Sequence, residues 1–187
     1  MKIEQPLYEV ISTTFGTMGI VWWKTLAGPR VRQTLLSKGQ KPVEGVIQEN
    51  YPNAQRLASP VIVGLGNQIQ SFLNGEAITF GLEIIALEVC GAFQRKVLLA
   101  EYRIPRGWVS TYGKIAKHVG VAGGSRAVGR ALAENPFPII VPCHRAVRVN
   151  GEIGGYQGGS DMKRALLEME GVEFTEKGRV SMHKVHY

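Results

Sequence analysis

Cysteine is scarce in this sequence, with only Cys90 and Cys143 among 187 residues. Two cysteines without a secretory signal indicate reduced thiols, and they exclude the disulfide framework of a small secreted domain. The chain has no Cys-x-x-Cys pair and no cluster of histidine and cysteine, so we expect neither a metal site nor a cofactor. The remaining candidates for metal ligands, His118, His183 and His186, lie in polar surroundings without suitable company.

Long hydrophobic runs are also missing. No apolar segment approaches the roughly 20 residues that span a bilayer, and residues 1–6 lack the apolar centre of a signal peptide. We therefore expect no membrane partner and an intracellular location, cytoplasmic or, if the source is a nucleated cell, nuclear. With 44% hydrophobic and 20% charged residues, the composition is that of a globular protein with one large or two small domains.

The formal net charge of +7 is concentrated in the second half of the chain. Residues 1–90 carry seven basic and seven acidic side chains, residues 91–175 carry twelve and seven, and residues 176–187 carry three and one. A polyanion such as DNA suits the basic half, although the same excess is also typical of a solvated surface.

Cys143 stands in the segment 136–145, where an apolar run ends in Pro-Cys-His-Arg. A thiol reacts as its thiolate, which a nearby base or cation favours, so His144 and Arg145 predict an activated nucleophile. The alternative is a buried and inert structural cysteine, which is our interpretation of Cys90 among its apolar neighbours. Two prolines at the start of the segment predict that the apolar run is extended.

Glycine-rich turns and a helix follow the cysteine. Asn150-Gly151 and the sequence Gly-Gly-Tyr-Gln-Gly-Gly at residues 154–159 predict turns with close backbone approach. The next residues predict a helix that is capped by Ser160 and ended by Gly171. Glu170, at the end of this helix, is a candidate to orient a histidine.

Two short helices separated by a glycine turn precede the cysteine segment. Ser110-Thr111 caps a helix over 112–119, residues 120–124 turn, and a second helix covers 125–134. This outline is typical of a helix-turn-helix that binds DNA, although many helix pairs are only structural. Every second residue of the second helix from 127 to 133 is Ala or Gly, which predicts one side with little bulk. Such a side suits close approach to a minor groove that is recognised by its shape.

The first half predicts a small antiparallel sheet followed by two helices. Strands are expected over 8–13, 19–25 and 30–36, and helices over 42–50 and 60–74. The apolar face of the second helix is predicted to consist of Val61, Leu65, Ile69, Phe72 and Leu73. Trp22-Trp23 is interpreted as core packing, or as one buried and one solvent-facing ring, rather than as a binding platform. Residues 77–88 predict a connection, and residues 93–102 predict a further helix.

We therefore predict an α+β fold with three parts. Residues 1–85 form a small N-terminal sheet-plus-helix domain, and residues 86–175 form a mostly helical C-terminal domain with a winged helix-turn-helix-like DNA-binding motif. Residues 176–187 form a tail that is loose after a short hairpin made by 172–175 and 179–181.

Together these motifs resemble the O6-alkylguanine-DNA alkyltransferase family. The shared pattern is Asn-Pro-x-Pro, three apolar residues, Pro-Cys-His-Arg, Gly-Gly-Tyr-x-Gly-Gly and Leu-Leu-x-x-Glu-Gly, in the same order and spacing from about Phe93 to Gly171. The resemblance implies a monomer that repairs double-stranded DNA by direct reversal, with nucleotide flipping. The alkyl group of O6-alkylguanine, and also of O4-alkylthymine, would pass to Cys143 in a stoichiometric and irreversible transfer.

The resemblance also implies a role for each site residue. Cys143 is the nucleophile, His144 takes its proton through a water, and Glu170 orients the imidazole, while Arg145 stabilises the loop. Arg126 fills the space of the extruded base, and Tyr112 crowds the phosphate of the lesion and offers its hydroxyl to the departing base. The substrate-binding residues are Asn135, Ala146, Gly155, Tyr156 and Gln157, the last through its backbone N–H. The DNA-binding residues are Tyr112, Ser125, Arg126, Ala127, Gly129 and Arg130.

Two other functions fit parts of the pattern. A non-enzymatic DNA binder, either a lesion sensor or a transcription factor, would use the same helix pair, but the sensor relatives replace the residue at the position of Cys143. A Cys-His hydrolase would use the thiol. Hydrolases seldom take nucleophile and base from adjacent residues, however, and would need neither the basic charge nor the helix-turn-helix.

Overall fold

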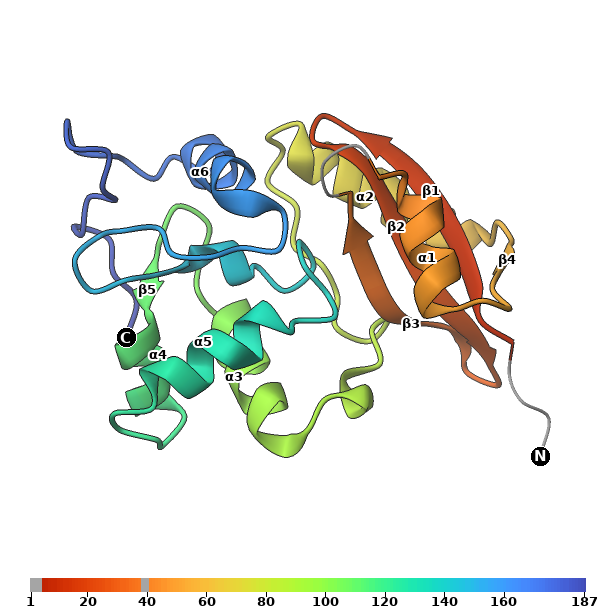
Figure 1. Cartoon of the computed structure of the whole chain (residues 1–187), viewed down its shortest axis with the longest axis horizontal. Helices are drawn as coiled ribbons and strands as arrows, with labels where there is room; N and C mark the ends of the chain where they lie inside the picture. The colour runs from red at the N-terminus through yellow and green to blue at the C-terminus, as the bar shows by residue number, and fades with distance from the viewer. Residues whose placement is uncertain (1–4, 38–40) are drawn as a thin grey trace. The chain divides into compact units, whose positions relative to one another are not determined.

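The computed structural model describes residues 5–37 and 41–187 (Figure 1). Residues 1–4, which open the predicted N-terminal domain, and residues 38–40 lie outside the described residues. The chain divides into two compact units, of which the first comprises Met1–Val89 with Pro136–Ile140 and the second comprises Cys90–Asn135 with Val141–Tyr187. The architecture is α+β, as predicted from the sequence.

A four-stranded sheet with the strand order β3-β2-β1-β4 forms the base of the first unit. The antiparallel pairs are β1 (Leu7–Thr13) with β2 (Gly16–Thr25) and β2 with β3 (Gly28–Leu36), whereas β4 (Gln55–Arg56) joins β1 in parallel. The three strands predicted from the sequence are confirmed. Successive side chains of β2 point to opposite faces of the sheet, so both faces need a cover.

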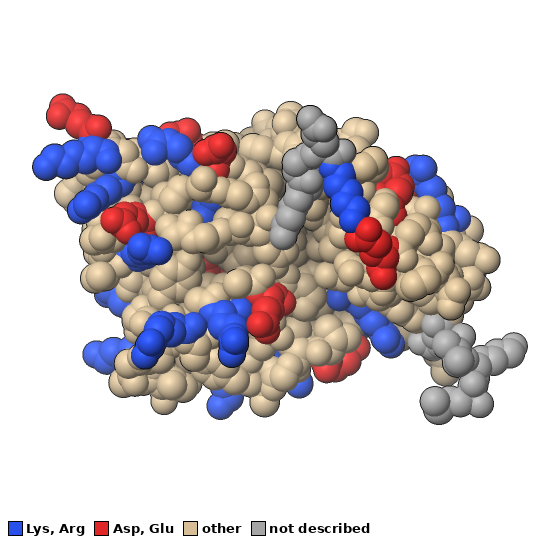
Figure 2. All heavy atoms as spheres, viewed as in Figure 1, with Lys and Arg blue, Asp and Glu red and all other residues tan. Residues whose placement is uncertain are grey.

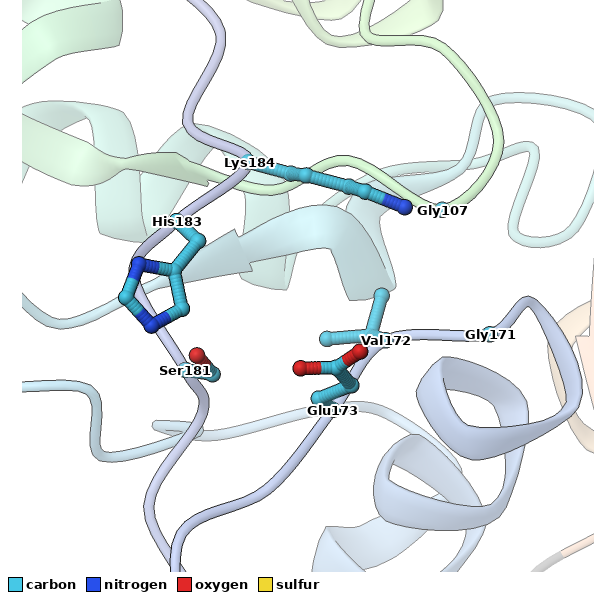
Figure 3. Close-up of a pocket in the computed structure, with 7 residues that line it drawn as sticks. All are labelled: Gly107, Gly171, Val172, Glu173, Ser181, His183 and Lys184. Carbon is cyan, nitrogen blue, oxygen red and sulfur yellow. The ribbon is translucent and has the colours of Figure 1, made fainter.

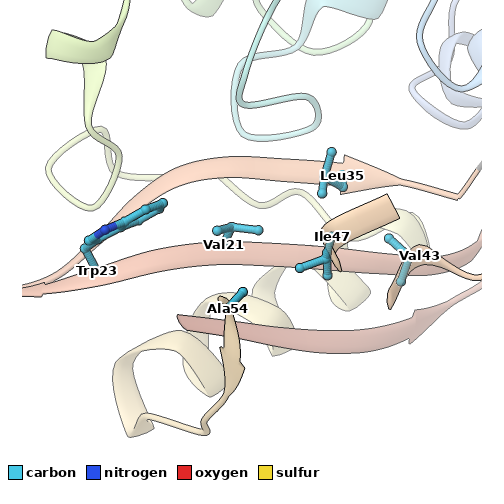
Figure 4. Close-up of a cluster of buried hydrophobic side chains, with 6 residues drawn as sticks. All are labelled: Val21, Trp23, Leu35, Val43, Ile47 and Ala54. Atoms are coloured by element: carbon cyan, nitrogen blue, oxygen red, sulfur yellow. The ribbon is translucent and has the colours of Figure 1, made fainter. Parts of the chain in front are cut away.

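Two helices provide this cover, α1 (Val43–Asn50) on one face and α2 (Pro60–Leu73) on the other. A buried cluster joins α1 to the sheet through Val21, Trp23, Leu35, Val43, Ile47 and Ala54 (Figure 4). On the opposite face α2 approaches so closely that a Cβ at Gly66 would lie 2.9 Å from the side chain of Ile11. Trp22 is also buried, so the core interpretation of the tryptophan pair is confirmed.

The predicted bounds of both helices agree with the structure within one residue, but one predicted core position in α2 is wrong. Val61 is 51% exposed, and the neighbouring Ile62 is fully buried instead. The apolar face of α2 runs through Ile62, Leu65 and Ile69, whose spacing of three and four residues places them on one side of the helix. The connection after α2 leads to a single turn of 3₁₀-helix, η1 (Leu87–Val89).

The apolar segment before Cys143 turns, and its predicted extended conformation is wrong. Thr34 of β3 holds the start of the segment, because its N–H donates to Pro136 O (2.8 Å) and its hydroxyl donates to Pro138 O (3.0 Å). The chain then turns at Ile139, which has a φ of +75°. This left-handed conformation costs a residue with a Cβ about 1–2 kcal/mol, so the hydrogen bonds from the sheet and the burial of Ile139 must offset it.

The second unit contains the predicted helix-turn-helix. Helices α3 (Ala92–Tyr102), α4 (Tyr112–His118) and α5 (Ser125–Ala133) pack against one another, and residues 119–124 connect α4 to α5. The hydroxyl of Thr111 caps α4, as predicted, by accepting from the Lys114 N–H (3.2 Å). A parallel two-stranded ladder joins β5 (Ser110–Thr111) to β6 (Ala146–Val147), and β6 directly follows the 3₁₀ turn η2 (Cys143–Arg145). The ladder therefore fixes the cysteine segment against the start of the helix-turn-helix.

The last helix, α6 (Gly159–Met169), starts earlier than predicted. Gly158 occupies the cap position, and the hydroxyl of Ser160 lies 3.5 Å from the Asp161 carboxylate instead of capping the helix. Gly171 ends the helix as predicted, with a φ of +82° that suits a residue without a side chain. None of the helices in the described parts of the chain is long and apolar enough to cross a membrane.

The C-terminal tail is held by backbone hydrogen bonds, so the prediction of a loose terminus is wrong. An antiparallel bridge between Phe174 and Val180 forms the predicted hairpin. Beyond it, the tail runs beside Val109, which donates to Lys184 O (3.0 Å) and accepts from the His186 N–H (2.8 Å). These bonds satisfy the polar backbone groups that a loose tail would expose to water.

Candidate active site

Cys143 begins η2, and only 4% of its surface is exposed. Asn135, which follows the end of α5, donates from Nδ2 to Cys143 Sγ (3.1 Å) and to Val141 O (3.1 Å). Burial raises the pKa of the thiol to about 11, against the lowering effect of the Asn135 hydrogen bond. The thiol is therefore protonated near neutral pH, contrary to the prediction that its neighbours favour the thiolate, so any reaction through the sulfur would require loss of this proton.

The carboxylate of Glu170, just past α6, binds the two residues that follow Cys143. It accepts from His144 Nε2 (3.0 Å), Arg145 Nε (2.8 Å) and Arg145 Nη2 (2.7 Å). Arg145 Nη1 also donates to Ile104 O (2.6 Å), which agrees with its predicted role of stabilising the loop. Burial alone would raise the pKa of Glu170, but the hydrogen bonds from His144 and Arg145 and the charge of the guanidinium lower it to about 2. Glu170 is therefore ionised.

Burial sets the charge of His144, and its hydrogen bond to Glu170 sets its tautomer. Burial lowers the pKa of the imidazole, against the opposing effect of Glu170, so the ring is neutral near pH 7. An ionised carboxylate can only accept hydrogen bonds, so the ring nitrogen that faces Glu170, Nε2, carries the proton. His144 can then take up a second proton only at Nδ1, so the predicted role of base falls to this atom.

Two buried charged side chains near Cys143 escaped the sequence analysis, Glu101 of α3 and Lys163 of α6. Lys163 Nζ donates to Ala146 O (2.7 Å) and to Gly155 O (3.2 Å), so it ties the cysteine segment to the glycine-rich loop. The carboxyl group of Glu101 is fully buried, and a backbone hydrogen bond at Ala146 only partly opposes the effect of this burial on its pKa. Burial raises the pKa of Glu101 to about 8 and lowers the pKa of Lys163 to about 8, each against the opposite charge of the other.

Helical spacing could have identified both residues from the sequence. Glu101 lies four positions after Val97 and three after Leu98, and Lys163 lies three positions before Leu166. Residues at these separations share one face of a helix, so each charge belongs to an apolar, buried face. A charge in that position needs a partner or a function.

The glycine-rich loop, residues 154–159, contacts several predicted site residues. A Cβ at Gly154, which has a φ of +71°, would lie 2.8 Å from the hydroxyl of Tyr112, so only glycine fits there. The pKa of the Tyr112 hydroxyl is raised to about 12 by burial and by Glu101. The ring of Tyr156 packs edge-on against His144, with ring centroids 6.3 Å apart.

The side chain of Gln157 has a role that the sequence did not indicate. Its Nε2 donates to Ala133 O (3.0 Å) and to Asn135 O (2.7 Å), at the C-terminal end of α5. The sequence analysis assigned only the backbone N–H of Gln157. The structure thus brings Asn135, Ala146, Gly155, Tyr156 and Gln157 together with Cys143, His144, Glu170 and Tyr112 in the second unit.

The exposed side of α5 carries four of the predicted DNA-binding residues, namely Ser125, Arg126, Ala127 and Arg130. In the view of Figure 2, basic side chains lie over α5. The predicted side of small residues is wrong, because Ala131 is buried and Gly129 is half-buried. With about 3.6 residues per turn, alternate residues point about 200° apart, so the positions from 127 to 133 cannot share one face.

A separate cavity of about 100 Å³ lies beside the C-terminal tail (Figure 3). Its lining consists of Gly107, Gly171, Val172, Glu173, Ser181, His183 and Lys184. It contains no cysteine and none of the predicted site residues, so it does not contribute to the chemistry at Cys143. Within residues 5–37 and 41–187, no group of three His, Cys, Asp or Glu side chains could hold a metal ion.

The ionised state of Glu170 makes the stability of the protein depend on pH. The pKa of the Glu170 carboxyl is about 2 in the folded protein, against an ordinary value of 4.5. The stabilisation that the ionised carboxylate provides is therefore complete above pH 4.5 and is lost as the pH falls toward 2. We expect Glu170→Gln to lower the free energy of unfolding near neutral pH by about 3 kcal/mol. The difference from wild type should shrink below pH 4.5, which urea unfolding between about pH 7 and pH 3 measures.

The matched control is Glu168→Gln on the same helix. The Glu168 side chain is 50% exposed and pairs with Arg164 at the surface, so its removal should change stability little at any pH. A stability difference for Glu170→Gln that stays constant between neutral and acidic pH would contradict the ionised, hydrogen-bonded state.

Comparisons with known proteins identify the family. Residues 92–172 match the family described as 6-O-methylguanine DNA methyltransferase, DNA binding domain. The chain is 44% identical over 156 residues to the methylated-DNA–protein-cysteine methyltransferase of Mycobacterium tuberculosis, covering 81% of this chain and 93% of that protein. It is 41% identical over 130 residues to the protein of the same name from Methanothermobacter thermautotrophicus, covering 70% and 71%.

The fold is similar as well. The Mycobacterium tuberculosis protein OGT, solved in complex with DNA, aligns with a TM-score of 0.70 and 31% identity over 88% of this chain and 93% of that one. The resemblance seen in the sequence is confirmed, and the chain belongs to the methylated-DNA–protein-cysteine methyltransferase family.

Proposed function

We propose that the protein repairs DNA by direct reversal, moving the alkyl group of O6-alkylguanine, and also of O4-alkylthymine, onto Cys143. The observation that carries this proposal is the buried thiol, bonded to Asn135 and followed in the chain by the His144–Glu170 pair. The same unit contains the helix-turn-helix with its exposed arginines. Similarity to a relative that was solved in complex with DNA supports DNA as the partner.

The transfer itself is a displacement at the alkyl carbon. His144 Nδ1 takes the thiol proton through a water, while Glu170 holds the ring by its other nitrogen and stabilises the imidazolium that forms. The sulfur forms a bond to the alkyl carbon, and the bond from that carbon to O6 breaks. The electron pair stays on guanine, which takes a proton from the Tyr112 hydroxyl, and the imidazolium returns a proton to tyrosine through solvent.

The product is a thioether, which explains a single turnover. Regenerating the thiol would require displacement of a poor leaving group from the alkyl carbon, and none of the residues described here supplies a nucleophile for that step. Each molecule therefore repairs one lesion.

The pocket would read guanine through backbone groups. The carbonyls of Cys143 and Ala146 accept from the exocyclic amino group, and the Gln157 N–H donates to O6. Ala146 O already accepts from Lys163, but a carbonyl oxygen has two lone pairs and can accept a second bond. Tyr156 packs on the base and Gly155 leaves room for it.

The lesion lies inside the base stack, so the nucleotide must be flipped out before transfer. We infer that α5 enters the minor groove, where Arg126 in its first turn occupies the space of the extruded base. Ser125, Ala127, Gly129 and Arg130 would approach the DNA backbone without reading base edges, which suits a lesion that occurs in any sequence. A monomer suffices for this contact.

The nucleophile is tested by mass spectrometry of peptides after the protein is mixed with duplex DNA containing O6-methylguanine. The wild type should gain one methyl group, on the peptide that contains Cys143. Cys143→Ser should gain none while it keeps nearly the wild-type affinity for the DNA, because the phosphate contacts come from other residues. Cys90→Ser is the control and should react like wild type. A methyl group on Cys90, or more than one repaired lesion per molecule, would refute the assignment.

Base flipping is tested with Arg126→Ala on two substrates. Repair of O6-methylguanine in a duplex should slow much more than the reaction with free O6-benzylguanine, because only the duplex requires extrusion. Single-turnover rate constants on both substrates measure the effect.

Arg130→Ala provides the comparison, since Arg130 is exposed on the same helix but lies beyond the first turn. It should weaken DNA binding and leave both rate constants at saturating substrate unchanged. If Arg126→Ala lowers the rate constants on both substrates equally, Arg126 supports the fold or the transfer step and not base extrusion. A change of sequence preference without a repair defect would indicate a transcription factor instead.

A further inference from the structure

Side-chain amides satisfy the C-terminal end of α5. The last carbonyls of a helix have no partners within the helix and need other donors. Two of them accept from the backbone, Arg130 O from the Glu134 N–H (3.0 Å) and Leu132 O from the Asn135 N–H (3.2 Å). Four others accept from two glutamines, Ala131 O and Glu134 O from Gln94, and Ala133 O and Asn135 O from Gln157. Every carbonyl from 130 to 135 therefore has a donor.

The two glutamines come from different parts of the unit. Gln94 belongs to the first turn of α3, and its Nε2 lies 3.2 Å and 3.0 Å from its two acceptors. Gln157 belongs to the glycine-rich loop, and its Nε2 lies 3.0 Å and 2.7 Å from its acceptors. The amides thus make the same kind of contact, but only Gln157 connects α5 to the loop.

The loop has a second attachment on its other side. Lys163 Nζ binds Gly155 O and Ala146 O, next to the cysteine segment. Between the two attachments, Tyr156 packs against His144. Displacement of either attachment would therefore move the ring that faces the base.

Asn135 connects the first attachment, made by Gln157, to the thiol. Its backbone carbonyl accepts from Gln157, and its side-chain amide donates to Cys143 Sγ and Val141 O. Asn135 is buried, so its side chain follows any shift of its backbone.

We propose that Gln157 is a positioning residue, whose side-chain amide couples the DNA-facing helix α5 to the loop and to the Asn135 amide that binds the thiol. The proposal rests on the alkyl transfer proposed above and assigns to the side chain a role separate from that of the backbone N–H. The side chain of Gln157 acts through Asn135 and Tyr156 and does not touch the reacting atoms, in contrast to the backbone N–H proposed to reach O6.

An amide suits this coupling better than a hydroxyl or an apolar group. It carries two N–H donors on one nitrogen, which match two carbonyls that belong to residues two positions apart. Ala133 is exposed, so water can replace one of these bonds when the amide is removed. Removal should therefore leave the protein folded while the loop loses its fixed position.

The test compares Gln157→Met, Gln157→Lys and Gln94→Met. Methionine keeps the length of the side chain without donors, and lysine restores donors together with a charge that suits a helix C-terminus. Gln157→Met should lower the transfer rate constant at saturating substrate about tenfold, on duplex O6-methylguanine and on free O6-benzylguanine alike, because small displacements at a reacting centre are costly. The dissociation constant for DNA should not change, and Gln157→Lys should recover most of the rate.

Gln94→Met is the matched control, because it removes two hydrogen bonds from the same helix end without touching the loop. It should lower the melting temperature about as much as Gln157→Met does, with a transfer rate constant within about twofold of wild type. Equal losses of the transfer rate constant in the two Met variants, or a wild-type rate constant in Gln157→Met, would mean that Gln157 only caps α5 and would overturn the proposal.

Hydrogen exchange separates this proposal from the proposed function. The Gly159 N–H closes the loop on Tyr156 O (3.1 Å), and the peptide over 154–159 should exchange faster in Gln157→Met than in Gln94→Met. A wild-type protein that transfers no methyl group would refute the proposed function, while this exchange result would still support the attachment of the loop. Equal exchange in the two variants would refute the attachment even if the wild type is active.

Discussion

The site depends on the buried carboxylate of Glu170. It binds Arg145 through two hydrogen bonds and His144 through a third, so it fixes two consecutive residues of the turn that begins with Cys143. Three hydrogen bonds from two residues compensate the cost of burying this charge, whereas loss of the carboxylate would leave the Arg145 guanidinium buried and incompletely paired. The same contact sets the histidine tautomer. One interaction therefore determines both the shape of the cysteine turn and the histidine nitrogen that is free to accept a proton.

Burial keeps the thiol inactive until a substrate is present. The pKa of about 11 means that Cys143 is protonated near neutral pH, and 4% exposure limits its contact with solutes. Oxidation and alkylation by small molecules both attack the thiolate, so burial and protonation protect Cys143 from these reactions. The buried Lys163 ties the cysteine segment to the glycine-rich loop. The fold thus keeps the predicted nucleophile, Cys143, in its protonated form.

The sequence predicted most of the elements and the family, and its failures have local causes. Periodicity located the strands, both helices of the first unit and the helix-turn-helix, because each has one apolar face. It could not show that Thr34 holds the segment at 136–138, since those residues are distant in sequence, and so the turn at Ile139 was missed. The prediction of a side of small residues on α5 was wrong because small residues at every second position were assigned to one face of the helix. The partners of Gln157, 22 and 24 positions before it, follow from the loop geometry, which the sequence does not specify. The identities and roles of the site residues remain predictions.

The most direct test of this account is the ionisation and tautomer of His144, observed by ¹⁵N NMR of the imidazole in the unalkylated protein. Between about pH 6 and pH 8, the account predicts a neutral ring whose proton resides on Nε2 and is hydrogen-bonded to Glu170. Replacement of Glu170 by glutamine should alter this signal, and replacement of the exposed Glu168 should not. An imidazolium near neutral pH, or a neutral ring with its proton on Nδ1, would contradict the account.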